Sequence, residues 1–441
     1  MRQVIRVNPK ITVILTSYNK PDTVGKAINS VLNQTFNNWE LFIMDDASNT
    51  QTTNIIHTYL DDSRIYYYNS GIKDNQRYKK TRYATLINIA ISLSHGEYIS
   101  YLTDDVFYLP ERLEEMAHFL DQHPSINIVY SGQLIKHVDH SYNVVAEKNL
   151  NTKGILKKAA HQVDHCSVMH TRNIANEVFK SYQSYWNDDP MYWYNADAAF
   201  WNRLNRFAPF HPIPKVLDVS LITPSSLQQL TSYLPETIPD GVLVKGLDDK
   251  VYLIDNQKRR HISEAMFDQL KYNRANVVQI PDPILFKYEE TMPIDLNLVN
   301  NGFIPNQRLV QSRESKEMYF IQDNKKRKIC NNRVLRRFHL HIKDIILMDD
   351  ITLTKLKDGE VIVERISNNT LLPDGVVFKY MNTHYLSINH CLHPVHLKIL
   401  NKLKLFTRNA VRLTKGEFQL FEVATPITWP FIGEDNKQHK I

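Results

Sequence analysis

The stretch Tyr98-Ile99-Ser100-Tyr101-Leu102-Thr103-Asp104-Asp105 decides the fold of the N-terminal half of the chain. Its apolar run ends abruptly on two acidic residues, and Pro110 and an amphipathic helix follow. This pattern predicts a buried strand whose carboxyl end presents paired carboxylates. Such a pair suits a hard divalent cation held against phosphate oxygens. Aspartates after a strand also commonly cap the next helix, so the neighbouring elements have to be considered.

Strands alternate with helices around this stretch. Continuous apolar runs predict strands, and apolar side chains at helical spacing predict helices. Strands are expected at residues 11–15, 39–44, 65–68, 98–103 and 126–130, and helices at residues 24–34, 52–60, 81–94 and 111–120. The alternation predicts an α/β fold with a mostly parallel sheet flanked by helices.

Polar residues follow three of these strands. They are Thr16 and Tyr18, Asp45 and Asp46, and Asp104 and Asp105. Ligands of parallel α/β sheets bind at the carboxyl ends of the strands, where we expect a nucleotide. A dinucleotide-binding Gly-x-Gly-x-x-Gly turn is missing, because Ser17-Tyr18-Asn19-Lys20 follows the first strand, and a Walker phosphate loop is missing too. The pattern therefore favours a nucleotide site built from side chains and a metal ion.

Five segments together resemble the inverting family-2 glycosyltransferases of the GT-A fold. They are residues 16–19 (TSYN), 42–48 (FIMDDAS), 81–83 (TRY), 102–105 (LTDD) and 164–170 (DHCSVMH). The nearest match is the spore-coat polysaccharide glycosyltransferase of bacilli, and the whole chain resembles spore maturation or crust glycosyltransferases. The resemblance implies sugar transfer from a UDP- or dTDP-sugar to a hydroxyl of a glycan or glycoprotein, with Mn²⁺ or Mg²⁺. It also implies a role in spore-coat or cell-surface polysaccharide biosynthesis, in the cytoplasm (the mother cell of a spore former) or at the spore surface.

The resemblance also implies roles for individual residues. On the donor side these are Asp46 on the uracil or thymine imide, Thr16 and Tyr18 beside the base, Arg77 on the nucleotide, Asp104 near the ribose and Asp105 on the metal ion. Asp197 falls where the family keeps its catalytic base. The family usually has Gly before this Asp and a basic residue two positions after it, whereas this chain has Ala196 and Ala199. The departure concerns the acceptor side of the site.

These residue types suit inverting sugar transfer. A bound cation neutralises the leaving diphosphate, and one carboxylate accepts the proton of the acceptor hydroxyl. Double displacement would need a second, nucleophilic carboxylate, and nothing in the sequence singles one out.

Each assignment has a structural alternative. Asp45 and Asp46 could cap the following helix, Arg77 could lie in a solvated basic loop, and Asp197 could be an ordinary surface residue. A zinc site at His165, Cys166 and His170 is disfavoured, because neighbouring side chains of a strand point to opposite faces. In the aromatic segment after residue 181, Trp186 and Trp193 are the expected sugar contacts, and the other rings are expected in the core.

The C-terminal half is internally repeated. Pro239-Asp240-Gly241-Val242 recurs as Pro373-Asp374-Gly375-Val376, and residues 250–260 are echoed by residues 317–327. The period predicts three β-rich modules, each with one helix. The expected domains are a GT-A domain at residues 1–230 and modules at residues 231–300, 301–366 and 367–441.

Charge also separates the two halves. The first 230 residues contain 22 basic and 22 acidic side chains, so the net charge of +6 comes from the modules. Two basic blocks, residues 258–261 and 325–328, are either solvated hairpin tips or a docking site for an anionic polymer or coat protein. No nucleic-acid motif occurs, and nucleic acid is not an expected partner.

Composition narrows the class further. The chain has no run of ~20 apolar residues and no apolar signal region, so we expect no transmembrane segment. The Gln-x-x-Arg-Trp motif of processive membrane-bound synthases is also missing. Three scattered cysteines are consistent with reduced thiols. Two other functions stay open: a catalytically retired GT-A protein that binds carbohydrate or assembles a surface layer, and a sugar nucleotidyltransferase, which the lack of a Gly-rich loop disfavours.

Overall fold

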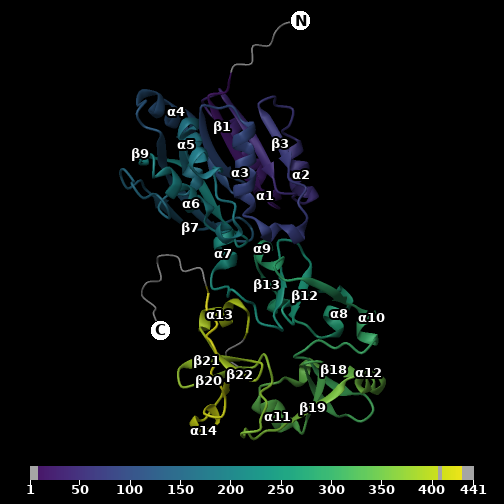
Figure 1. The fold of residues 1–441 in the computed structure, drawn as a ribbon. Coiled ribbons are helices and arrows are strands. Elements are labelled where there is room, and N and C mark those ends of the chain that lie inside the picture. Colours follow the sequence, from purple (N-terminus) through teal and green to yellow (C-terminus); the bar gives the residue numbers. More distant parts are fainter. Residues whose placement is uncertain (1–7, 406–409, 430–441) are drawn as a thin grey trace. The chain divides into compact units, whose positions relative to one another are not determined.

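The computed structural model describes residues 8–405 and 410–429. The chain divides into two compact units, Met1–Ser226 and Leu227–Ile441 (Figure 1). Within the described residues, no helix is both long and apolar enough to cross a membrane.

The first unit is an α/β domain with one large sheet. Its strands are β1 (Ile11–Ser17), β2 (Trp39–Asp45), β3 (Ile65–Asn69), β4 (Tyr98–Thr103), β5 (Val106–Tyr108), β6 (Ile128–Val138), β7 (Val144–Leu150), β8 (Val168–Thr171) and β9 (His211–Ile222). Its α-helices are α1 (Pro21–Leu32), α2 (Thr50–His57), α3 (Arg82–Leu93), α4 (Arg112–Gln122), α5 (Arg172–Tyr182) and α6 (Ala196–Leu204). The expected strands and helices of residues 11–130 are confirmed, with ends shifted by a few residues.

The sheet has the order β3-β2-β1-β4-β8-β6-β9-β5, with β7 beside β6. Strands β3, β2, β1 and β4 run parallel, whereas β8 pairs antiparallel with both β4 and β6. Thr16 on β1 is in register with Met44 on β2 and Thr103 on β4. The three polar strand ends found in the sequence therefore meet at one edge of the sheet.

Helices cover both faces of the sheet. Side chains of β1 alternate between two cores, since Val13 and Leu15 pack with α1, α2 and α4, whereas Ile14 packs with α3, α5 and α6. Strands that are apolar on both faces are typical of a sheet buried between two helical layers. The GT-A fold class is thereby confirmed.

The second unit contains three smaller sheets, each from a successive part of the chain. Their orders are β13-β10-β11-β12-β14, β18-β15-β16-β17-β19 and β22-β21-β20-β23. The strands are β10 (Leu243–Lys245), β11 (Val251–Asp255), β12 (Lys258–Ile262), β13 (Val278–Gln279), β14 (Glu290–Ile294), β15 (Leu309–Ser312), β16 (Met318–Gln322), β17 (Lys325–Ile329), β18 (Ile345–Met348), β19 (Lys357–Ile362), β20 (Val377–Tyr380), β21 (Thr383–Ile388), β22 (Cys391–Val395) and β23 (Val411–Arg412). The helices are α7 (Leu227–Thr231), α8 (Glu264–Gln269), α9 (Asp282–Leu285), α10 (Leu296–Asn300), α11 (Asn332–Arg337), α12 (Asp350–Thr354), α13 (Leu397–Lys402) and α14 (Lys415–Phe418). The module boundaries given above stay predictions.

The repeated Pro-Asp-Gly motif supports a tight hairpin turn. In the first module, Asn256 and Gln257 both have positive φ, which is the type I′ turn that joins twisted strands. The carboxylate of Asp240 accepts hydrogen bonds from both of their backbone N–H groups, at 3.0 and 2.9 Å. In the third module, Asp374 accepts one from His390 at 3.2 Å. In both of these modules the Asp of the motif supplies the acceptor that the turn needs.

The basic blocks are engaged inside the second unit. In residues 258–261, Arg259 pairs with Glu290 at 2.8 Å and Arg260 with Asp255 at 2.7 Å. In residues 325–328, the buried Arg327 donates to Gln322 Oε1 at 2.7 Å and to backbone carbonyls. These contacts favour a structural role for both blocks over docking of a polymer.

Candidate active site

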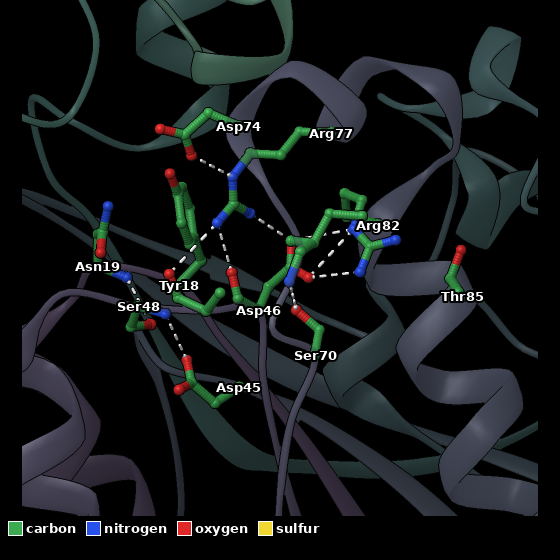
Figure 2. Close-up of polar contacts among 12 residues, drawn as sticks. Tyr18, Asn19, Asp45, Asp46, Ser48, Ser70, Asp74, Arg77, Arg82 and Thr85 are labelled. Atoms are coloured by element: carbon green, nitrogen blue, oxygen red, sulfur yellow. Dashed lines mark hydrogen bonds and ion pairs between the residues drawn. The ribbon is translucent and has the colours of Figure 1, made fainter.

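Asp46 lies at the centre of a buried cluster of charges at the carboxyl end of β2 (Figure 2). Arg77 Nη1 is 2.7 Å from Asp46 Oδ2, and Arg82 Nη2 is 2.7 Å from Oδ1. The side chains of Asp46 and Arg77 are only 6% and 3% exposed. The solvated-loop alternative for Arg77 is therefore wrong, and the helix-cap alternative for Asp46 is wrong too, since Asn49 caps α2.

Asp45, next in the chain, has a different role. Its carboxylate is fully buried and accepts hydrogen bonds from Ser48 N, from the hydroxyl of Tyr67 and from Asn69 Nδ2. These contacts fix the turn after β2. Asp45 is consequently a structural residue, and Asp46 is the carboxylate of this strand end that pairs with arginines.

Thr16 and Tyr18 end the neighbouring strand. Thr16 is buried, and the guanidinium of Arg77 lies over the ring of Tyr18 at 4.1 Å. The backbone N–H of Tyr18 donates to Asp104 Oδ2 at 2.8 Å. The ends of β1, β2 and β4 are thus joined through direct contacts, and the structure brings Thr16, Tyr18, Asp46, Arg77 and Asp104 together.

Asp104 and Asp105 follow β4 and differ in exposure. Asp104 is buried, and burial together with the charge of Asp105 raises the pKa of Asp104 above its ordinary value. Asp105 is more accessible: its Oδ1 accepts a hydrogen bond from the Thr103 hydroxyl, and its Oδ2 lies 3.9 Å from Lys20 Nζ. Two adjacent carboxylates, one of them partly exposed, form a hard oxygen donor set that fits Mg²⁺ or Mn²⁺.

Asp197 lies in the first turn of α6. Burial raises its pKa above the ordinary range, and the nearby His165 opposes that shift. The hydroxyl of Tyr83 accepts a hydrogen bond of 2.7 Å from Ala196 N, at the start of the same helix. Tyr83 therefore fixes the backbone that carries Asp197.

A 3₁₀ turn at His165–Ser167, capped by Asp164, lies near Asp197, where a strand was expected. The expectation of strand alternation there is wrong, since ligand atoms of Asp164, His165 and Cys166 lie within 4.8 Å of one another. Burial raises the pKa of the Cys166 thiol well above its usual value, so without a metal ion this thiol is protonated. Thr103 Oγ1 lies 3.6 Å from Cys166 Sγ, which connects the end of β4 to this turn.

His170 and Trp186 belong to the core. Burial lowers the pKa of His170 to about 4, and its Nε2 lies 2.7 Å from the hydroxyl of Tyr101. Trp186 is fully buried and stacks on Phe200, so its expected sugar contact is wrong. Trp193 is partly exposed.

Sequence reasoning assigned no role to Arg82, Lys20 or Tyr83. Arg82 and Tyr83 occur in the quoted segment at residues 81–83, but only the folded chain shows what they contact. Lys20 follows the first strand directly, and a cation at that place was the available signal.

A parallel half-sheet with acidic side chains at adjacent strand ends is the arrangement of a GT-A glycosyltransferase. The model of the family described as glycosyl transferase family 2 matches residues 12–182. Protein CgeD of Bacillus subtilis (strain 168) is 39% identical over 418 residues, which are 95% of this chain and 95% of CgeD. This chain belongs to glycosyl transferase family 2 and is a glycosyltransferase related to Bacillus proteins.

Two further matches are shorter. The UDP-Glc:alpha-D-GlcNAc-diphosphoundecaprenol beta-1,3-glucosyltransferase WfaP of Escherichia coli is 33% identical over 111 residues, 25% of this chain and 41% of WfaP. The crystal structure of S. aureus TarS 1-349 in complex with UDP covers 49% of this chain and 61% of that chain, with 17% identity and a TM-score of 0.37.

Proposed function

We propose that the first unit is a metal-dependent inverting glycosyltransferase that moves a sugar from a UDP- or dTDP-sugar to an acceptor hydroxyl. The observation that carries this proposal is the cluster at the ends of β1, β2 and β4, where Asp46 and Arg77 lie beside Tyr18, and Tyr18 contacts Asp104. The similarity to WfaP, which is named as a UDP-Glc glucosyltransferase, supports a uridine nucleotide as the donor.

In this proposal each residue of the site has a separate role. Asp46, held by two arginines, accepts the imide N–H of the base, and Thr16 and Tyr18 border it. Arg77 contributes a fixed positive charge near the nucleotide. Asp197 takes the proton from the acceptor hydroxyl, and its raised pKa makes it a stronger base than an ordinary aspartate.

Asp105, with Asp104 behind it, would hold Mn²⁺ or Mg²⁺. The ion would supply positive charge to the leaving diphosphate. Lys20, near Asp105, adds a further positive charge on that side of the site.

The test is calorimetric titration of UDP and dTDP into the protein, with Mn²⁺ and then with EDTA. We expect micromolar binding that needs the metal and is lost in Asp105→Asn, but kept in the control Asp61→Asn, whose carboxylate is exposed at another place. Binding that is unchanged by EDTA and by Asp105→Asn would refute the metal assignment.

The competing function is a retired GT-A domain that binds carbohydrate or assembles a surface layer. UDP release from a panel of UDP-sugars separates the two, because a retired domain would bind UDP without turnover. Asp197→Asn should keep UDP affinity and lose release of UDP. A role in spore-coat or cell-surface polysaccharide synthesis, in the cytoplasm or at the spore surface, is part of the proposal. It rests on the resemblance of the sequence to spore-coat glycosyltransferases of bacilli, with which the similarity to a Bacillus subtilis protein agrees. Docking of the modules on an anionic polymer or coat protein stays a prediction.

A further inference from the structure

The second unit contains a cavity of about 340 Å³ lined by all three modules. We call it the module cavity. Each module contributes the residues around its Pro-Asp-Gly position and the residues that end its first helix. Its volume lies at the small end of ligand pockets, which are roughly 300–1,000 Å³.

Equivalent residues of the three modules meet at this cavity. Gly241, Gln307 and Gly375 occupy the same place in successive modules, and all three have positive φ. A Cβ atom on Gly241 would lie 2.0 Å from Gln307 Oε1, and one on Gly375 would lie 2.2 Å from the same atom. Gln307 Nε2 also donates to the backbone carbonyl of Asp240 at 3.0 Å. The Gln307 side chain thus packs against the turns of both other modules.

The helix ends place a basic or imidazole side chain on the cavity in each module. Lys271, His339 and Lys404 follow α8, α11 and α13, and all have φ between 52° and 56°. The same left-handed helix end in three modules puts them at equivalent positions. The complete lining has four lysine or arginine residues and two aspartates, one of which, Asp374, already supports a hairpin turn. The cavity is therefore positively charged.

Three buried polar atoms of lining residues have no hydrogen-bond partner within the described part of the chain. They are Tyr272 Oη, Asn276 Oδ1 and Arg308 Nε. Tyr272 and Arg308 also contact each other, with the guanidinium 4.4 Å over the ring. Buried polar groups are nearly always paired in folded proteins, so three unpaired atoms in residues around one cavity point to a missing partner. These atoms are themselves closed to solvent, so a ligand pairs with them only after a small shift of the three side chains. That partner must both accept hydrogen bonds and donate one.

We propose that the module cavity binds one anionic sugar unit, that is, a sugar bearing a carboxylate or a phosphate. The anion would face the basic side chains and accept from Arg308, while sugar hydroxyls would pair with Tyr272 and donate to Asn276. A ligand that combines an anionic group with hydroxyl groups meets all three requirements and also matches the positive charge of the cavity, which a water molecule does not. The proposal does not rest on the catalytic function of the first unit.

The test is calorimetric titration of the full-length protein with four probes: galacturonate, glucose 6-phosphate, glucose and inorganic phosphate. We expect galacturonate or glucose 6-phosphate to bind at least about tenfold more tightly than glucose or inorganic phosphate, because each control ligand lacks half of the required groups. Equal binding of inorganic phosphate would reduce the cavity to an anion site and overturn the proposal, as would no binding of any probe. Titration of tetragalacturonate then distinguishes the two sources of the sugar unit. Tighter binding than galacturonate indicates a residue of a polymer, and weaker binding indicates a free sugar acid.

Variants of lining residues test whether the ligand binds in the module cavity. Arg308→Gln should weaken affinity about tenfold or more, since it removes a charged hydrogen bond. Tyr272→Phe removes only a hydroxyl that has no partner, so it should weaken affinity while leaving the melting temperature unchanged. Lys404→Gln should weaken affinity slightly and lower its salt dependence. The matched control is Lys325→Gln, which removes an equal charge from an exposed position that does not line the cavity. Unchanged affinity in both Arg308→Gln and Tyr272→Phe would place any binding elsewhere and overturn the proposal.

Discussion

Replacing Asp46 by Asn should destabilise the first unit strongly. The carboxylate of Asp46 is the anion that Arg77 and Arg82 share, at 2.7 Å each. In Asp46→Asn the neutral amide leaves two guanidinium groups side by side, and the Arg77 side chain is only 3% exposed. Water therefore cannot replace the lost charge.

Removing one partner of a buried ion pair typically costs about 3–5 kcal/mol. For a domain of this size, each kcal/mol lowers the melting temperature by about 2–4 °C, so the expected decrease is about 6–20 °C. Asp74→Asn is the matched control, because Asp74 pairs with the same Arg77 but is 63% exposed. Exposed pairs contribute about 0–1 kcal/mol, so this variant should melt within a few degrees of the wild type.

The assay is thermal unfolding followed by tryptophan fluorescence. Four of the five tryptophans, at positions 39, 186, 193 and 201, belong to the first unit and report on its transition. UDP titration in parallel shows whether the folded variant has also lost nucleotide affinity. If Asp46→Asn melted within about 2 °C of the wild type, the two arginines would have to find other partners or reach solvent, and the reasoning from burial would be refuted.

Three further predictions concern other buried groups. UDP release should fall as the pH decreases through the raised pKa of Asp197, because the base must be ionised, and a rate that stays constant down to about pH 4, the ordinary pKa of an aspartate, would contradict this role. The pKa of His170 is about 4 in the fold, so between about pH 6.5 and 4 only the unfolded chain takes up this proton, and stability should decrease by up to about 3 kcal/mol as the pH falls. The stability of His170→Gln, measured by urea unfolding, should not show this decrease. If stability depended on pH identically in His170→Gln and the wild type, the prediction would be contradicted. Arg112→Met should cost about 3–5 kcal/mol, since it leaves the buried Asp218 without its cation. Burial raises the pKa of Asp218 to about 6, so protonation relieves this cost at low pH, and urea midpoints should differ more at pH 8 than at pH 5.

The sequence predicted most of the first unit because its signals are local. Apolar runs and helical spacing predicted every strand and α-helix up to residue 130 except the short strand β5. The polar strand ends could be placed together because parallel strands in register end at one edge of the sheet, as the alignment of Thr16 with Met44 and Thr103 shows. The repeated Pro-Asp-Gly motif likewise revealed the modules, since each copy supports its own turn.

Other features required the folded chain. The family resemblance singled out Asp46 for the nucleotide base, but only packing showed that Asp45 holds a turn while Asp46 pairs with two arginines. The sequence presented Trp186 as a sugar contact, although the side chain is fully buried.

The sequence alone therefore determined the order of the elements, the repeats and the acidic strand ends, because these depend on residues that are close in the chain. The tertiary structure decided that Asp45 holds a turn while Asp46 pairs with two arginines, that arginines of the basic blocks pair within the second unit, and that Tyr272, Asn276 and Arg308 line one cavity. Those outcomes depend on contacts between residues far apart in the chain, such as Arg77 with Asp46 or Gln307 with Asp240, which no local pattern encodes.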